Sequence, residues 1–198
     1  RIESSAAAWI RVMPTLETPY RDIATVWRQR NEPRKAIAVL EQGRKRIDRP
    51  DALALELGDA WAQAGDLQKA AAEWARAVGP EGRAFLLVQR RLQAQPEGGA
   101  RAIPLLVDQL SAGNATFGRR RAATLLALEA GLESRAARLS GELVAQAPVA
   151  EREQLLVELA RRADAAGLHR VALWSYEEML RGTRDAGSAL AIRTRMAE

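Results

Sequence analysis

The chain carries apolar residues at helical spacing almost throughout, and the pattern is clearest between Asp51 and Glu81. In the first part of this stretch they recur every three or four residues, which predicts a helix with one apolar face. These positions are Leu53, Leu57, Ala60, Trp61 and Ala64. Gly65 and Asp66 then interrupt the pattern, because Gly readily ends a helix and Asp caps the next one. A second apolar series follows at Leu67, Ala70, Ala71, Trp74, Ala77 and Val78. The stretch therefore predicts two short helices folded back on each other.

Small residues set the expected spacing between these two helices. Gly58 and Ala70 leave room for the backbones to approach, while Trp61 and Trp74 fill the space around them. The stretch resembles the tetratricopeptide repeat, a helix–turn–helix unit of about 34 residues. The residues at its signature positions are Leu57, Gly58, Trp61, Gly65, Ala70, Trp74 and Ala77.

The same pattern recurs along the chain with a nearly constant period. Repeat starts are predicted near residues 17, 51, 84, 117 and 153, at separations of 34, 33, 33 and 36 residues. The third repeat is degenerate, because Arg91 occupies a position that is usually small and Pro104 lies inside the predicted second helix. Partial repeats are expected at residues 1–16 and 187–198.

Local signals give approximate helix ends. Residues 3–13 are predicted to be helical, and Thr18 is expected to cap the next helix with Pro19 in its first turn. A helix is expected to stop before Pro96, with residues 96–99 as a turn. Helices are also predicted over residues 119–130 and 134–146.

Taken together, these patterns predict an all-α fold. The resemblance implies a single domain over residues 1–198, built as a right-handed superhelical solenoid of antiparallel helix pairs. A helix at either end would leave its apolar face uncovered, because a repeat buries that face only against a neighbour. We therefore expect further repeats of a longer array, or partner chains, to cover both ends.

Composition narrows the classes of function. There are no cysteines, which excludes disulfides, thiolate metal sites and cysteine nucleophiles. The chain holds 30 basic and 25 acidic residues, and this even mixture is typical of solvated helix faces with ion pairs. A nucleic-acid surface would need the basic residues gathered on one face. No apolar run is long enough to span a membrane.

Residues that could support catalysis are sparse. His169 is the only histidine, and it lies just after a predicted turn, where a solvated or capping role is expected. Glu177 and Glu178 are adjacent on a helix and point in different directions. Phosphate-loop, dinucleotide-binding and zinc-protease spacings do not occur. The sequence therefore predicts no catalytic, metal or cofactor site.

A binding face follows from the helical period together with the resemblance, which implies that the first helix of each repeat lines a concave surface. The predicted partner-binding residues are Arg21, Thr25, Arg28, Leu55, Asp59, Val88, Leu92, Arg121, Leu125 and Arg161. This surface would have a basic entrance, an apolar middle and a mixed far end, which suits a peptide with hydrophobic anchors and acidic flanks. The alternative for the middle is that Phe85, Val88 and Leu92 pack into the core.

Two further features bear on the choice of ligand. Some tetratricopeptide domains grip a terminal carboxylate with an Asn, but the matching positions here hold Thr25 and Asp59. The run Arg119–Arg121 opens a helix and could contact acidic protein, RNA or lipid headgroups, or remain solvated.

The resemblance implies a non-catalytic scaffold that binds a partner protein or peptide within a larger assembly, for example in a bacterial envelope or secretion system, often in the periplasm. The alternatives are an accessory nucleic-acid-binding module that uses the Arg-rich helices, and an appendage that positions an enzyme domain outside this segment.

Overall fold

The computed structural model describes residues 8–183 and 185–197, which are helical throughout except for their connections. The chain is all-α: it is 79% helical, and the described residues contain no strand. It divides into two compact units, residues 1–109 and residues 110–198. Within the described ranges, no helix is both long enough and apolar enough to cross a bilayer.

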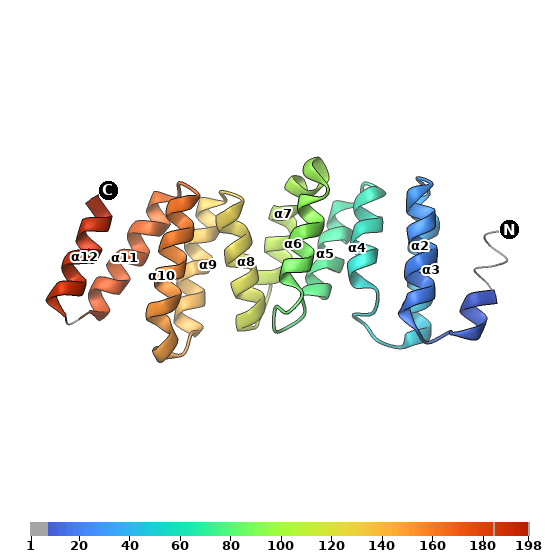
Figure 1. The fold of residues 1–198 in the computed structure, drawn as a ribbon, viewed down its shortest axis with the longest axis horizontal. Helices are drawn as coiled ribbons and strands as arrows, with labels where there is room; N and C mark the ends of the chain where they lie inside the picture. Colours follow the sequence, from blue (N-terminus) through green and yellow to red (C-terminus); the bar gives the residue numbers. More distant parts are fainter. Residues whose placement is uncertain (1–7, 184, 198) are drawn as a thin grey trace. The chain divides into compact units, whose positions relative to one another are not determined.

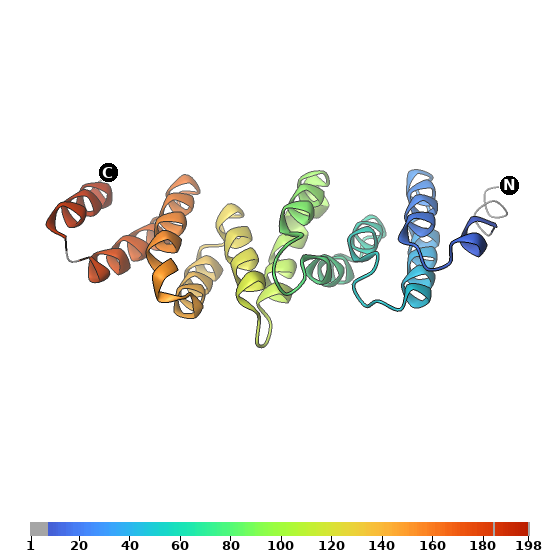
Figure 2. The same cartoon turned by 60° about the horizontal axis from the view of Figure 1, so that its bottom comes forward.

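The first unit consists of helix pairs that follow one another along the chain (Figure 1). After a helical turn at residues 8–12 come α2 (Glu17–Gln29), α3 (Pro33–Ile47), α4 (Ala54–Gln63), α5 (Leu67–Val78), α6 (Phe85–Gln93) and α7 (Pro96–Ser111). Helix α2 packs on α3, α4 packs on α5, and α4 also contacts α2 and α3. Figure 2 shows the loop of residues 48–53 that connects α3 to α4. Much of the core is formed by Tyr20, Ile23, Trp27, Leu40, Leu57 and Trp74.

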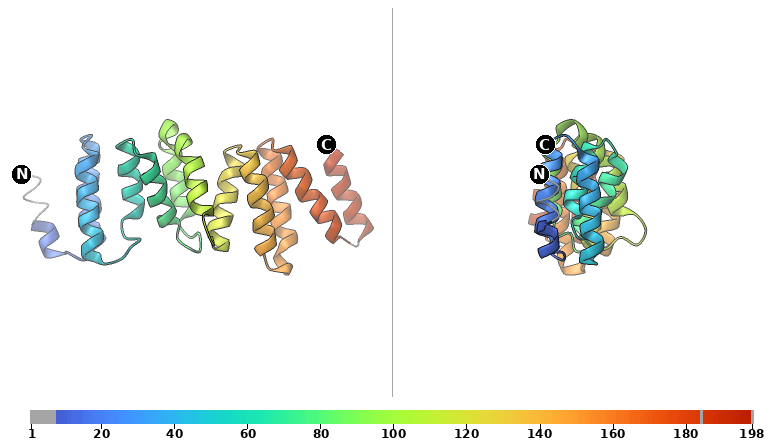
Figure 3. Two further views of the ribbon diagram at one scale, coloured as in Figure 1. Left: turned by 180° about the vertical axis from the view of Figure 1, so that it is seen from behind. Right: turned by 90° about the vertical axis from the view of Figure 1, so that its right-hand side faces the viewer.

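The second unit repeats this arrangement. It contains α8 (Phe117–Glu129), α9 (Glu133–Gln146), α10 (Val149–Ala165), α11 (His169–Gly182) and α12 (Ala186–Ala197). Helices α8 and α9 form one pair and α10 and α11 another, and α9 contacts both helices of the second pair (Figure 3). The fully buried side chains Leu128, Leu139, Leu143 and Leu159 fill the space between them.

The predicted turn between α4 and α5 is confirmed. Gly65 has a φ of +86°, a conformation that Gly adopts without a steric penalty, and it ends α4. Asp66 caps α5, because its Oδ1 accepts a hydrogen bond from the Lys69 backbone N–H at 3.0 Å. This hydrogen bond lowers the pKa of the Asp66 carboxyl.

Several predicted helix ends are wrong by a few residues. Thr18 is not a cap, because α2 already begins at Glu17. Leu53 lies outside α4: it has left-handed backbone with φ +59°, and its buried side chain is held in the core ahead of the helix. Residues 96–99 are helical rather than a turn, because α7 begins at Pro96 and Pro is well suited to a first helical turn.

Other boundaries were predicted closely. Pro104 does lie inside a helix, α7, and α9 begins one residue before the predicted start. Of the helix predicted over residues 3–13, residues 8–12 are helical and residues 3–7 lie outside the described residues.

The small residues of the first unit permit the close approaches that the pattern implied. A Cβ at Gly58 of α4 would overlap the indole ring of Trp74 on α5. A Cβ at Gly43 of α3 would lie 2.5 Å from Tyr20 Cγ and 2.8 Å from Leu53 Cδ1. In both places a large side chain occupies the volume that any residue other than glycine would need.

This packing predicts opposite outcomes for two glycine substitutions. Gly58→Ala should lower the free energy of unfolding by about 1–3 kcal/mol, because Trp74 has to shift to admit the methyl group. Gly141→Ala in α9 is the matched control, since its Cβ would lie 4.0 Å from Trp174, an ordinary contact. It should be neutral or stabilising by up to about 1 kcal/mol, because Ala favours a helix more than Gly does. Urea unfolding followed by far-ultraviolet circular dichroism measures both. Equal effects would contradict the assigned contact.

Candidate functional site

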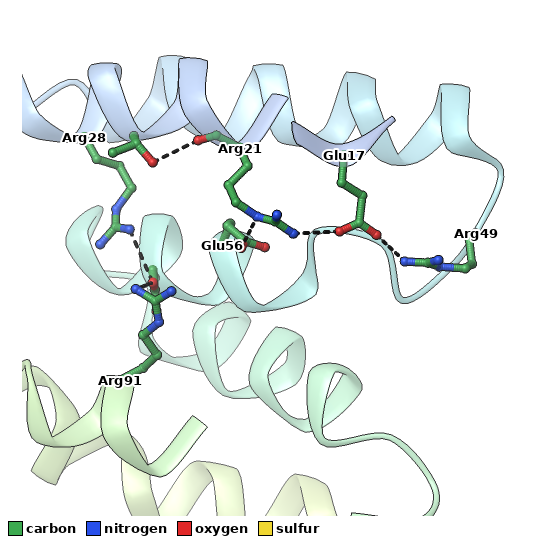
Figure 4. Close-up of polar contacts among 8 residues, drawn as sticks. Glu17, Arg21, Arg28, Arg49, Glu56 and Arg91 are labelled. Carbon is green, nitrogen blue, oxygen red and sulfur yellow. Dashed lines mark hydrogen bonds and ion pairs between the residues drawn. The ribbon is translucent and has the colours of Figure 1, made fainter. Parts of the chain in front are cut away.

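The most distinctive polar site in the first unit is centred on Asp59 of α4, which is only 1% exposed. Its Oδ1 accepts a hydrogen bond from Trp74 Nε1 on α5 at 3.2 Å. Its Oδ2 lies 3.3 Å from Arg28 Nη1 on α2 and 3.2 Å from Arg91 Nη1 on α6. Figure 4 shows Arg28 and Arg91, which extend from different helices. One buried side chain thus connects four helices.

Burial dominates the electrostatics of this site. Removal of the carboxylate from water raises the pKa of Asp59, although Arg91, Arg28 and the Trp74 hydrogen bond all act in the opposite direction. The arginines are partly exposed, with 26% of the Arg28 side chain and 44% of the Arg91 side chain accessible. Solvent therefore weakens their attraction to the carboxylate. The ionised form of Asp59 is tolerated in the fold rather than favoured by it.

A second set of ion pairs lies along the same side of α2 and α4. Arg21 Nε lies 2.7 Å from Glu56 Oε1 on α4, and Arg21 Nη2 lies 2.8 Å from Glu17 Oε2 one turn earlier on α2. Glu17 also pairs with Arg49, in the loop that precedes α4 (Figure 4). These contacts join the first helices of two successive pairs.

The second unit contains the same kind of connection. Arg121 of α8 lies 2.6 Å from Glu158 of α10, a separation of 37 residues in sequence, close to the 35 between Arg21 and Glu56. A second pair joins the same two helices, with Arg162 Nη1 3.1 Å from Glu129 Oε1. In each unit, therefore, an arginine on one first helix pairs with a glutamate on the next first helix.

The basic run at the start of α8 is largely engaged in such contacts. Arg120 is buried, pairs with Glu142 of α9, and donates from Nε to Gln146 Oε1 at 3.1 Å. Together with the Arg121–Glu158 pair, this contact explains why cations are tolerated at a helix N-terminus, where the helix dipole opposes them.

The structure places the predicted binding residues in two groups. Arg21, Thr25, Arg28 and Leu55 lie at or near the surface of the first unit, and Arg121 and Arg161 lie at the surface of the second. Val88, Leu92 and Leu125 are buried, which corrects the expected exposure of these three side chains. Asp59 is also buried, and its partners are internal. In the predicted apolar middle of the surface, Val88 and Leu92 are therefore core, the alternative that the sequence left open, whereas Phe85 is only partly buried.

On α10, the predicted binding residue Arg161 shares an exposed helix face with two further residues. Gln154, Val157 and Arg161 follow one another at helical spacing on this helix, and all three are exposed. None of them makes a side-chain hydrogen bond or ion pair with another described residue. This stripe is open to a partner.

Sequence reasoning missed the partners that organise the site. These are Glu56, Gln63, whose Oε1 accepts a hydrogen bond from Arg28 Nε at 3.3 Å, Trp74 as a hydrogen-bond donor, and above all Arg91. The one available signal was that Arg91 stands where the repeat pattern expects a small residue. A long side chain at that position can reach α4, and in this structure it does.

No histidine, aspartate or glutamate cluster among the described residues is arranged to hold a metal ion. No family model matches the sequence, and the comparison with curated proteins gives no match.

The raised pKa of Asp59 predicts a pH dependence of stability. Below the usual value of 3.8 the carboxyl is protonated in both the folded and the unfolded chain, and the stability that it contributes is greatest. That contribution is lost as the pH rises through the higher pKa of the folded state. Asp59→Asn removes the titration while keeping the shape. The free energy of unfolding of the wild type, relative to this variant, should therefore increase between about pH 7 and about pH 4.

Urea titrations of both proteins at the two pH values measure this difference, and titrating groups that do not interact with Asp59 cancel in the comparison. A difference that stays constant, or that shrinks on acidification, would show that the pKa of Asp59 is not raised.

Proposed function

We propose that this chain is a non-catalytic scaffold that binds a protein partner through an array of stacked helix pairs of the tetratricopeptide type. The observation that carries the proposal is the recurrence of the same connection in both units, Arg21 to Glu56 and Arg121 to Glu158. A contact that repeats at nearly one repeat length is what stacked, similar units produce. It agrees with the period that the sequence predicts.

Partner binding is the use that such stacking favours. In a solenoid each unit contacts only its neighbours, and the successive first helices present an extended surface. The exposed stripe of Gln154, Val157 and Arg161 on α10 offers an amide, an apolar side chain and a guanidinium on one helix face. A mixture of this kind suits a protein surface that supplies apolar and acidic groups. A multiprotein assembly, such as one in a bacterial envelope, is the setting we propose.

The charge arrangement supports a protein partner over nucleic acid. Nucleic-acid affinity depends on cations that are free to replace the counterions of phosphates. In the densest basic run, Arg120 and Arg121 are already paired with Glu142 and Glu158. Binding to phosphate would have to compete with these internal pairs.

A pull-down with the immobilised chain tests the proposal, with nuclease-treated extract of the source organism and identification by mass spectrometry. We expect a small set of proteins to be retained at moderate salt. Arg161→Glu should weaken their retention by about tenfold, corresponding to about 1.4 kcal/mol, without altering the thermal melt. Arg170→Glu, at an exposed arginine on α11, is the matched control and should have no effect. If a parallel pull-down from untreated extract recovers only nucleic-acid-associated proteins, and nuclease treatment removes them, the nucleic-acid module is favoured instead.

A further inference from the structure

A groove of about 800 Å³ lies in the first unit, between one face of α3 and the turn that joins α4 to α5. Its apolar lining includes Ile37 and Ala38 from α3, Trp61 from α4, Ala64 from the turn that follows α4, and Leu67 from α5. Trp61 is only half-buried, so part of its ring is accessible along the groove. This apolar surface is separate from the first-helix face described above.

Charges of opposite sign mark the two ends of the α3 wall. Arg34 and Glu41 both line the groove, and both are exposed. They are seven residues apart on one helix, which places them two turns, or roughly 10 Å, from each other. Neither side chain has an ion-pair partner among the described residues. Each is therefore available to a charge of opposite sign on a ligand.

The other charges of the groove are already compensated. Lys69 Nζ lies 4.1 Å from the centre of the Trp61 ring and 3.1 Å from Asp66 Oδ2. Asp66 is also engaged as the cap of α5. The groove thus offers an apolar floor with one unpaired cation and one unpaired anion at a fixed separation.

The walls favour a helical occupant over an extended one. A peptide that binds by strand addition needs main-chain hydrogen-bond partners at the edge of a sheet. Here the walls are α3, α4 and α5, whose backbone groups bond within each helix, and the described residues contain no strand. A helix satisfies its own backbone groups. The spacing of 34, 37, 38 and 41 on α3 also forms the kind of ridge against which another helix packs.

We infer that this groove binds two turns of an amphipathic helix of a protein partner. The helix would place apolar side chains on Ala38, Trp61 and Leu67, an acidic residue against Arg34, and a basic residue seven positions away against Glu41. This inference rests on the proposed scaffold function and adds to it the class of ligand and a second surface.

Three helical peptides test the inference. Each is stabilised by an internal crosslink, and all three carry the same apolar residues. Their flanking residues, seven positions apart, are Glu and Lys, Lys and Lys, or Glu and Glu, and binding is measured by fluorescence anisotropy. The wild type should prefer the Glu–Lys peptide. Arg34→Glu should shift the preference to Lys–Lys, and Glu41→Arg should shift it to Glu–Glu, each by about threefold to tenfold. Arg46→Glu, at an exposed position of α3 outside the groove, is the matched control and should leave the preference unchanged.

A variant that blocks the groove provides a second test of the inference. Ala38→Trp fills the groove from an exposed position and should abolish binding of the Glu–Lys peptide while the circular dichroism spectrum is retained. Peptide binding that survives Ala38→Trp, or that responds equally to Arg34→Glu and Arg46→Glu, would overturn the inference. So would a failure of all three peptides to bind better than a scrambled sequence. If the Ala38→Trp variant still retains extract proteins in any of these cases, the scaffold proposal holds and only the groove is excluded as the binding site.

Discussion

The packing of α4 against α5 in the first unit depends on the absence of a side chain at Gly58. Because no Cβ occupies that position, the Trp74 indole lies directly against α4. In this position its N–H reaches the carboxylate of the next residue, Asp59. The carboxylate is held with its second oxygen toward Arg28 and Arg91, which come from helices of the preceding and following pairs. The space left by the missing methyl group of Gly58 therefore determines where the buried Asp59 carboxylate lies and which helices it connects.

The ion pairs act more on geometry than on net stability. A buried carboxylate loses its hydration, and the attraction of partly exposed arginines offsets only part of that loss. What the pairs do is restrict which faces of neighbouring helices can meet, as at Arg21–Glu56 and Arg121–Glu158. Cations engaged in this way are not free for a ligand. Under the proposed function, the partner would instead contact the exposed stripe on α10 and the groove beside α3.

Much of the fold is accessible from the sequence, because helical period and turn chemistry are local. The Gly65–Asp66 turn, the burial of Trp74 and the position of Pro104 inside a helix all follow from short-range patterns. The stacking of tetratricopeptide type stays a prediction. The site was predicted less well, because side-chain reach is not periodic. Val88 and Leu92 occupy apolar positions of a regular pattern, and such positions look the same in the sequence whether they face solvent or core. Arg91 reaches Asp59 across 32 positions of sequence.

The Asp59 cluster also limits how the chain can evolve. Arrays of helix pairs commonly change length by gain or loss of a whole unit, a change that usually leaves each remaining unit intact. Here an insertion or deletion between α2 and α6 would separate Asp59 from at least one of its arginines and leave a buried carboxylate with a single cation. Duplication in this part of the gene thus carries the penalty of a buried carboxylate that has lost a partner. Positions 28, 59 and 91 are expected to change together or not at all.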